Sequence, residues 1–501
     1  MAVSGIAGAV SPLIQNVTTL DRQLADLQRQ LSTGQKTDTF SGLGSQADIA
    51  VGLSAQLSAI SGFGDTISAV GTSISLAQSA LTQISKASDT AKAAAETAPF
   101  DPGGGGITTA QRTAQGAFDA VLAALNTQGG NGYLFSGTGV NQPPVDTVDH
   151  ILNGVGSRAG LIQVTAERQQ ADLGANNLGR LVISAPTPTS LSLSEDVAGS
   201  PFGFKLAGVN SSLTGAVVTG PSGSPAAISV DLTAGNPNPG DSISFTFSLP
   251  DGSSEKLTLQ ATTSSPPAAG QFTIGATPAA TTANLQAALT TSLGTLAQTS
   301  LSAASAVAAS NDFFSNPPQR VVGPPFTTAT AQVAGTAANT VFWYTGENGP
   351  LPPRSTATAR IDPTLTVSYG LRANEAGIRR IVQNVATLAA ASYSASDPNA
   401  LGRYQALNGR VNTALATIPG LPSVQDIEAD LAGSQAAIQD ATDRHRQTQL
   451  TVTNFLQQIE GVNNDEVAAQ ILSLQTSLSA SLSTTARLAQ TSLLNFLAPV
   501  A

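Results

Sequence analysis

The two histidines, His150 and His445, are the natural starting point in a search for metal or acid–base chemistry. Neither is followed by a second metal ligand at the three- or four-residue spacing that would place both on one face of a helix. Residues 443–446 (Asp-Arg-His-Arg) are typical of a solvated charged surface, because such side chains are rarely buried. We therefore expect no bound metal and no catalytic histidine.

Other motifs that carry chemistry are also missing or incomplete. The sequence contains no G-x-S-x-G, H-E-x-x-H or G-K-[ST] motif, and its Asp and Glu residues suggest no acid–base pair. Residues 103–106 are four glycines before a predicted helix, but no strand precedes them and no Lys-Ser/Thr follows, so we interpret them as a flexible connector rather than a phosphate loop. Trp343 and Tyr344 are expected in a core, with sugar binding as the alternative. We predict a protein without catalytic residues and without a cofactor.

Composition narrows the class of protein further. The chain has no cysteine, which excludes disulfides, thiolate metal sites and a cysteine nucleophile. Charged residues make up 11% of the sequence, against roughly 25% in typical soluble domains, so copies of this chain repel one another weakly. The net charge of −10 argues against a nucleic-acid partner.

The sequence also bears on export and membrane association. The first basic residue is Arg22, so we expect no conventional signal peptide. No apolar run reaches the roughly 18 residues of a membrane-spanning helix. We expect no membrane insertion, and either a soluble chain or export without a cleaved signal peptide.

Residues 10–31 have the pattern of a helix that packs along one seam. Their apolar positions alternate in steps of three and four over three heptads, and the intervening positions are mostly polar. Gly34 follows where a helix end is expected. The seam residues are Val10, Leu13, Val17, Leu20, Leu24, Leu27 and Leu31.

The last forty residues carry a second apolar stripe, which includes Val467 and Leu482. We expect the two chain ends to form an antiparallel coiled coil that is buried between subunits of a larger assembly. The C-terminal residues predicted at this interface are Ile471, Leu474, Leu478, Leu488, Leu493 and Phe496.

Long helices are predicted on both sides of a different kind of sequence. We expect helices over 48–98, 108–127, 373–389, 401–418 and 424–460, with a break at 462–464 before the last helix. A turn-rich loop over 129–139 contains Tyr133, Leu134 and Phe135, which form either a buried plug or a contact to a neighbouring subunit.

Residues 181–366 lose the heptads and are rich in Pro, Gly, Ser and Thr. Ile243, Phe245 and Phe247 alternate with polar residues, and Asp251-Gly252 follows, which predicts a β-hairpin. One short helix is expected over 282–296. The predicted fold is mainly α, a helical coiled-coil rod formed by both chain ends with an inserted β-rich domain. Its predicted parts are 1–46, an assembly helix; 47–180 and 367–460, the two halves of the rod; 181–366, the insert; and 461–501, the second assembly helix.

Three motifs resemble the flagellin and hook–filament junction superfamily of bacterial flagella. Residues 24–34 resemble the end of the family's first helix, where leucines precede a Ser-x-Gly turn. Residues 132–138 (Gly-Tyr-Leu-Phe-Ser-Gly-Thr), followed by Pro143 and Pro144, resemble the flagellin-like junction protein, hook-associated protein 3. Residues 489–497 resemble the closing helix of the family.

The sequence departs from filament flagellin after the first helix. Gly42-Leu43-Gly44-Ser45 stands where the family usually has an acidic, alanine-rich stretch, and Lys36 is the only counterpart of its basic residue. This departure favours the junction protein, with filament flagellin as the alternative. An extracellular coiled-coil adhesin is the third alternative, but it does not require amphipathic stripes at both chain ends.

The resemblance implies a structural subunit of the extracellular flagellum that joins hook to filament. The implied partners are a hook-side junction protein, flagellin, further copies of the chain and an export chaperone. Such subunits leave the cell unfolded, and their terminal helices fold on assembly.

Overall fold

A computed structural model describes the chain except for residues 1–2, 104, 131, 417 and 497–501. The chain divides into two compact units. The terminal unit comprises Met1–Ala69, Ala359–Val367 and Ala436–Ala501, and the central unit comprises Val70–Thr358 and Ser368–Gln435. Within the described residues, no helix combines the length and the hydropathy required to span a membrane.

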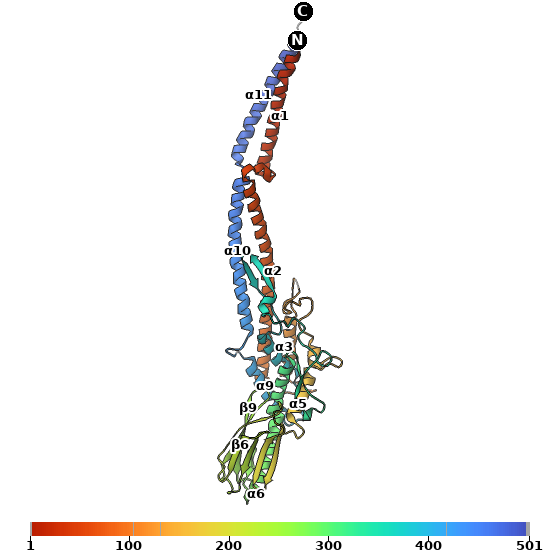
Figure 1. The fold of residues 1–501 in the computed structure, drawn as a ribbon, viewed down its shortest axis with the longest axis vertical. Coiled ribbons are helices and arrows are strands. Elements are labelled where there is room, and N and C mark those ends of the chain that lie inside the picture. The colour runs from red at the N-terminus through yellow and green to blue at the C-terminus, as the bar shows by residue number, and fades with distance from the viewer. Residues whose placement is uncertain (1–2, 104, 131, 417, 497–501) are drawn as a thin grey trace, which may run out of the picture. The chain divides into compact units, whose positions relative to one another are not determined.

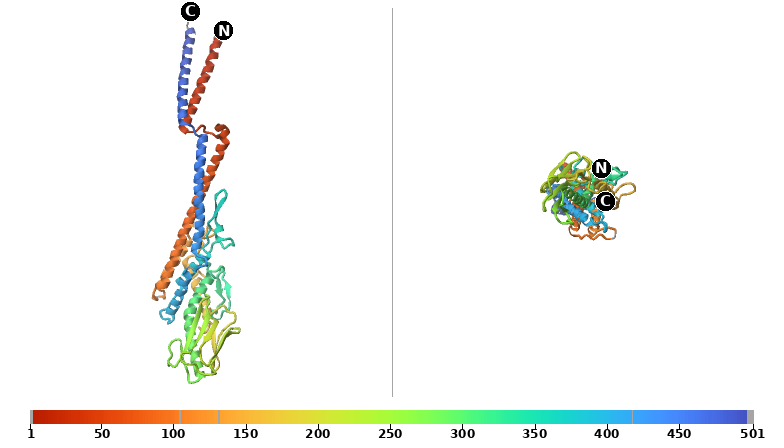
Figure 2. Two further views of the ribbon diagram at one scale, coloured as in Figure 1. Left: turned by 90° about the vertical axis from the view of Figure 1, so that its left-hand side faces the viewer. Right: turned by 90° about the horizontal axis from the view of Figure 1, so that it is seen from below.

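The terminal unit consists mainly of helices from the two ends of the chain. Helix α1 (Val3–Thr33) lies antiparallel to α11 (Asn464–Phe496), as Figures 1 and 2 show. A 3-10 segment, η1 (Phe40–Gln46), leads into α2 (Ala47–Thr97). The predicted helix over 10–31 therefore lies within α1, and the predicted helix over 48–98 corresponds to α2.

Helix α1 ends where the sequence predicts. Gly34 adopts a positive φ of 71°, and its N–H donates to the carbonyl of Gln30 at 2.8 Å. Glycine adopts this left-handed conformation without a Cβ penalty, which makes it a frequent helix C-cap.

Helix α10 (Val424–Glu460) has the bounds that the sequence predicts. Its start is capped reciprocally, because Ser423 N–H donates to Asp426 Oδ2 at 2.8 Å and Asp426 N–H donates to Ser423 Oγ at 3.2 Å. In the terminal unit, Val452 and Leu456 of α10 form a small core with Ala50 of α2.

Outside residues 181–366, the described part of the central unit contains five shorter helices. They are α3 (Thr109–Leu125), α4 (Val148–Asn153), α5 (Leu161–Leu173), α8 (Ala376–Ala390) and α9 (Ala400–Leu415). The sequence predicts α3, α8 and α9 to within a few residues, but it does not identify α4 and α5 as separate helices.

Two four-stranded sheets follow α5. The first has the order β3-β4-β7-β6 and the second β10-β9-β8-β5. Their bounds are β3 Leu181–Thr187, β4 Ser190–Glu195, β5 Lys205–Ser211, β6 Val217–Ser222, β7 Ala227–Asp231, β8 Ser242–Ser248, β9 Ser254–Thr262 and β10 Gln271–Thr273.

The predicted hairpin is confirmed. Strands β8 and β9 pair antiparallel, with Ile243 opposite Leu259 and Ser248 opposite Ser254. The alternating residues Ile243, Phe245 and Phe247 are fully buried, as expected for the core-facing side of a strand. A mainly α fold with a β-rich insertion is thus correct.

The second part of the insertion is more helical than predicted. Helix α6 (Pro278–Leu296) continues through a π-helical turn (Ala297–Leu301) into α7 (Ser302–Phe313). Helix α7 packs against α5, α8 and α9, and most of its Ala and Ser side chains are buried. Residues 181–366 are therefore β-rich mainly in their first half, and their helices share a core with helices outside the range.

The remaining elements are short. They are β1 (Gln128–Gly129), β2 (Gly132–Tyr133), β11 (Gln319–Val321), η3 (Phe326–Thr328), β12 (Gln332–Ala334), η4 (Pro353–Thr356), β13 (Thr358–Asp362) and β14 (Leu365–Ser368). Trp343 and Tyr344, near them, are buried, and Trp343 Nε1 donates to the Phe314 carbonyl at 3.2 Å. Both side chains therefore lie in a core, as the sequence predicts, and neither ring is exposed for stacking against a sugar.

Candidate assembly interface

The predicted seam of α1 lies against α11 but is only partly covered. The side chains of Val17, Leu20, Leu24 and Leu27 are half-buried, and that of Leu31 is 40% exposed. On α11, Ile471 is buried, whereas Leu474 and Leu478 are half-buried. The side chains of the remaining predicted interface residues are not among those that the structure describes; these residues are Val10, Leu13, Leu488, Leu493 and Phe496.

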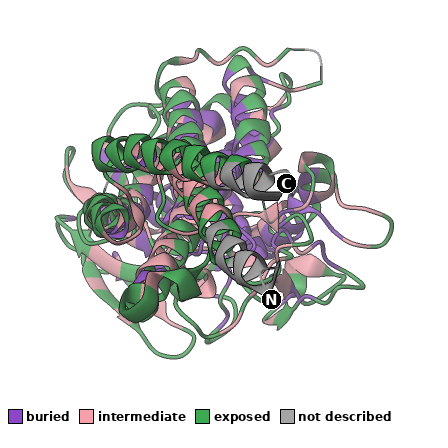
Figure 3. Cartoon of the chain, turned by 90° about the horizontal axis from the view of Figure 1, so that it is seen from above, coloured by how far each residue is buried: buried purple, intermediate pink, exposed green. Residues whose placement is uncertain are grey.

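Large apolar side chains also lie outside this seam. Ile14, Leu472 and Leu482 are 56%, 66% and 50% exposed. Figure 3 shows that the two helices that lead to the chain ends are mostly exposed, and none of the described side chains of α1 is buried. A pair of helices can cover only one stripe of each member, so this unit retains apolar surface that a further partner would bury.

One residue of the predicted apolar stripe, Leu482, does not lie at the seam. Leu482 is exposed, and among the side chains that the structure describes after Leu478, the half-buried ones are Ser481 and Thr485. The steps of three and four from Val467 lead to these two residues. A coiled-coil period of 3.5 therefore continues through small polar residues and leaves Leu482 on another face.

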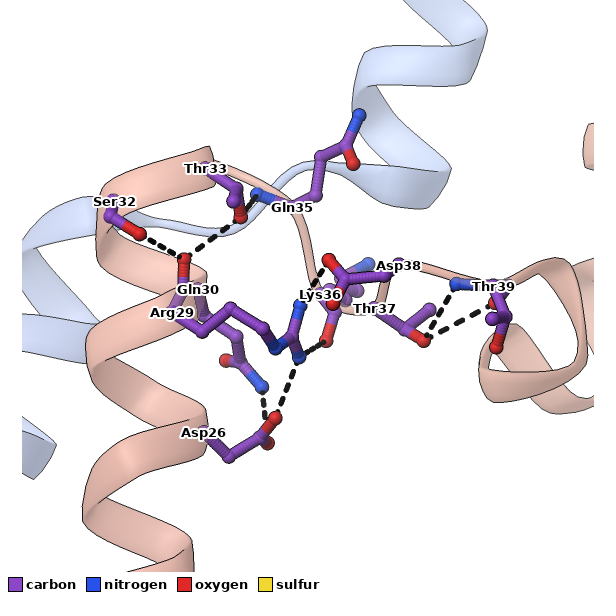
Figure 4. Close-up of polar contacts among 10 residues, drawn as sticks. All are labelled: Asp26, Arg29, Gln30, Ser32, Thr33, Gln35, Lys36, Thr37, Asp38 and Thr39. Carbon is purple, nitrogen blue, oxygen red and sulfur yellow. Dashed lines mark hydrogen bonds and ion pairs between the residues drawn. The ribbon is translucent and has the colours of Figure 1, made fainter.

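Hydrogen bonds connect the end of α1 to the segment that follows it. The guanidinium of Arg29 donates to Asp26 Oδ1 at 2.6 Å, to Asp38 Oδ1 at 2.8 Å and to the carbonyl of Lys36 at 3.2 Å (Figure 4). These contacts connect the last turns of α1 with residues 36–38, and they fix the direction in which the chain leaves the helix.

The break after α1 lies beside the break between α10 and α11. Gln35 and Gly461 form an antiparallel bridge, Lys36 N–H donates to the Glu460 carbonyl at 2.7 Å, and Val462 N–H donates to the Gly34 carbonyl at 3.1 Å. We call this set of contacts between residues 34–36 and 458–462 the connector bridge. Its residues are more than 400 positions apart in the sequence, which is why sequence patterns do not predict it.

Lys36 adds a charged contact to the connector bridge. Its Nζ donates to the carbonyl of Ile459 at 2.8 Å and to that of Gln458 at 3.5 Å, in the last turn of α10. The last carbonyls of a helix lack intrahelical donors and carry partial negative charge, so an ammonium group both caps and stabilises this end.

His445 is not part of a solvated surface, contrary to the sequence interpretation. Its side chain is 11% exposed, its Nε2 lies 3.3 Å from Asp362 Oδ2, and its ring lies 5.6 Å from that of Phe63. The neighbouring Arg444 and Arg446 are exposed, as predicted. One residue of the charged run therefore faces inward, because a helix turns successive side chains by about 100°.

The electrostatic setting of His445 is that of a structural contact. Desolvation raises the pKa of Asp362, but hydrogen bonds from Thr364 and His445 outweigh it, so the pKa is below its usual value. His150 Nδ1 contacts Asp146 Oδ1 at 2.8 Å. In the described part of the chain, no group of three or more His, Asp or Glu side chains is arranged to hold a metal ion.

The predicted loop motif lies in the central unit and is largely buried. Phe135 is fully buried, while Tyr133 and Leu134 are half-buried. Gly137 N–H donates to the Leu371 carbonyl at 3.0 Å, and Ala373 N–H donates to that of Phe135 at 2.8 Å. These contacts favour the plug over an interface role for Phe135.

Gly137 is required by its surroundings. Its φ is +65°, and an added Cβ would lie 2.7 Å from Glu347 Oε2. That carboxylate is engaged by the guanidinium of Arg372 at 2.7 Å. The Ser-Gly pair in this motif thus allows the loop to pass directly over a partly buried ion pair.

Comparison with known proteins identifies one related region. Residues 9–139 match the bacterial flagellin N-terminal helical region, a range that covers most of α1, all of η1, α2 and α3, and the loop motif. No curated protein matches the chain. The match covers 131 of the 501 residues, and it confirms that this region resembles the flagellin superfamily.

Proposed function

From the flagellin-type region over residues 9–139, we propose that the chain is the subunit that joins hook to filament at the flagellar junction. The terminal unit attaches it to neighbouring subunits through α1 and α11. The β-rich insertion is not required for that attachment.

The half-covered seam of the terminal unit carries this proposal. Leu24 and Leu27 on α1, and Leu474 and Leu478 on α11, are half-buried in the single chain. Burial of apolar area contributes about 25 cal/mol per Å², so a neighbouring helix pair that covers these side chains stabilises both partners. When several copies or related subunits meet, helix pairs of this kind cover one another's remaining apolar side chains.

The loop motif and the segment after α1 favour a junction protein over filament flagellin. The Leu-Phe-Ser-Gly-Thr sequence resembles hook-associated protein 3, and residues 42–45 depart from the usual flagellin pattern. A junction subunit has to contact unlike neighbours, a hook-side junction protein on one side and flagellin on the other.

We propose these two proteins, further copies of the chain and an export chaperone as partners. We also propose that the chain is exported without a cleaved signal peptide.

Deletion of the gene tests this function. We expect intact hooks and unpolymerised flagellin in the medium, because flagellin would lack the surface on which it polymerises. Complementation with the unaltered gene should restore filaments.

Filament flagellin is the second candidate, since the matching family region is that of flagellin itself. In that case the deletion mutant would lack the filament protein altogether, and the junction would still form on the hook. This result would reject the junction assignment.

A further inference from the structure

The seam between α1 and α11 does not define its own register. The described α1 seam positions are Val or Leu throughout, and those of α11 are aliphatic as far as Leu478, after which the seam continues through the small polar residues Ser481 and Thr485. In coiled coils, a single polar residue in the seam often fixes the register, and α1 has none at these positions. A slip by one heptad, about 10.5 Å along the axis, brings similar side chains face to face.

Charged side chains near the seam do not compensate. Arg29 forms ion pairs with Asp26 and Asp38. Both partners lie close to Arg29 in the sequence, and neither belongs to α11. The groove between the helices is lined by Gln23, Asp26 and Leu27 of α1 and by Gln470, Ser473 and Leu474 of α11. The register therefore has to be set by another part of the terminal unit.

The connector bridge supplies directional contacts at one end of the pair. Gln35 is opposite Gly461, and Lys36 binds α10 through both its N–H and its Nζ. Counting equal numbers of residues along each helix from this bridge, Asp26 lies level with Gln470 and Gln23 with Ser473. The same residues line the groove, so the seam follows the register that the bridge defines.

We propose that Lys36 is the positioning residue that sets the register of the α1–α11 pair, through its contacts with the last turn of α10. The importance of this register for assembly rests on the proposed function, because neighbouring subunits must meet the same arrangement of apolar side chains on every copy. The register itself is a property of the single chain.

The absence of cysteine allows a direct test on the full-length chain. One variant carries Gln23→Cys with Ser473→Cys and reports the native register. A second carries Gln23→Cys with Ala480→Cys and reports a slip of one heptad. Each pair is treated with a short bis-maleimide, and the rate of intramolecular cross-linking is measured by mass spectrometry.

We expect the native pair to react at least about tenfold faster than the shifted pair, and Lys36→Met to reduce that ratio about tenfold, the loss expected for a charge-assisted hydrogen bond. Lys36→Arg should preserve the ratio, since it retains a positive donor. Arg22→Met, which removes a charge from exposed α1 surface, is the matched control and should leave the ratio unchanged.

Gly461→Ala provides an independent variant. An added Cβ would lie 2.3 Å from the Gln457 carbonyl oxygen, so this substitution should displace the connector bridge and reduce the ratio without any change of charge. Equal ratios in the unaltered chain and the Lys36→Met chain, or equal losses for Lys36→Met and Arg22→Met, would overturn the proposal. Neither result would bear on the junction assignment, because no flagellum enters the experiment.

Discussion

Replacing Leu24 by Asp places a carboxylate in the half-covered seam of α1. Complete burial of a leucine side chain stabilises a protein by about 1.5–3 kcal/mol, and Leu24 is only half-buried. The isolated chain should therefore lose about 1 kcal/mol of local stability. In an assembly that covers the seam, an unpaired carboxylate loses its water at a cost of several kcal/mol, which weakens association by about a hundredfold or more.

The stability of the isolated chain and its incorporation into flagella are measured separately. Thermal unfolding of the isolated chain, followed by circular dichroism, should change little, whereas the amount of Leu24→Asp chain recovered with purified flagella should fall to background. Gln23→Asp introduces the same charge at the adjacent exposed position, on the rim of the α1–α11 groove, and should weaken assembly much less. Equal effects of the two substitutions on assembly would refute the seam, and loss of the main unfolding transition in Leu24→Asp would mean that the seam belongs to the monomer core.

Three further predictions concern the loop, the α10 cap and the C-terminal helix. Phe135→Ala should lower the free energy of unfolding by about 3–5 kcal/mol in urea titrations, and Tyr133→Ala should cost clearly less; equal losses would contradict the plug. Hydrogen bonds from Ser423 lower the pKa of Asp426 below its ordinary 3.8, so the cap stabilises the fold above that pH and is lost as the pH falls through the lowered value. Asp426→Asn should therefore be less stable than the parent at pH 7 but not in strong acid, and a pH-independent difference would contradict the cap. Deletion of residues 467–501 should retain the main unfolding transition and abolish incorporation into flagella, whereas loss of that transition would show that α11 stabilises the whole chain.

The sequence predicts the long helices well because their signal is local and repeated. The heptads of residues 10–31 lie within α1, and the bounds of α10 agree with the prediction at both ends. The β8–β9 hairpin is predicted for a similar reason, since alternation and an Asp-Gly turn are read within a few residues.

Features that depend on distant contacts are not predicted. The connector bridge joins the backbone near Lys36 to that near Glu460, and backbone bonds leave no side-chain pattern. Helix α7 is composed mainly of Ala and Ser, without an apolar stripe, and packing against α5, α8 and α9 stabilises it. The sequence predicts a solvated position for His445 because it lies in a run of charged residues, which are rarely buried. Asp362 and Phe63, which contact its side chain, come from other parts of the chain.

The junction assignment requires that the chain lie between hook and filament, and its position in the flagellum can be measured. Antibodies against the β-rich insertion, coupled to gold and viewed by electron microscopy on intact flagella, locate the subunit without altering it. We expect a single labelled band between hook and filament. Labelling along the whole filament would identify the chain as flagellin, and flagella without label would contradict a place for this subunit in the assembled structure.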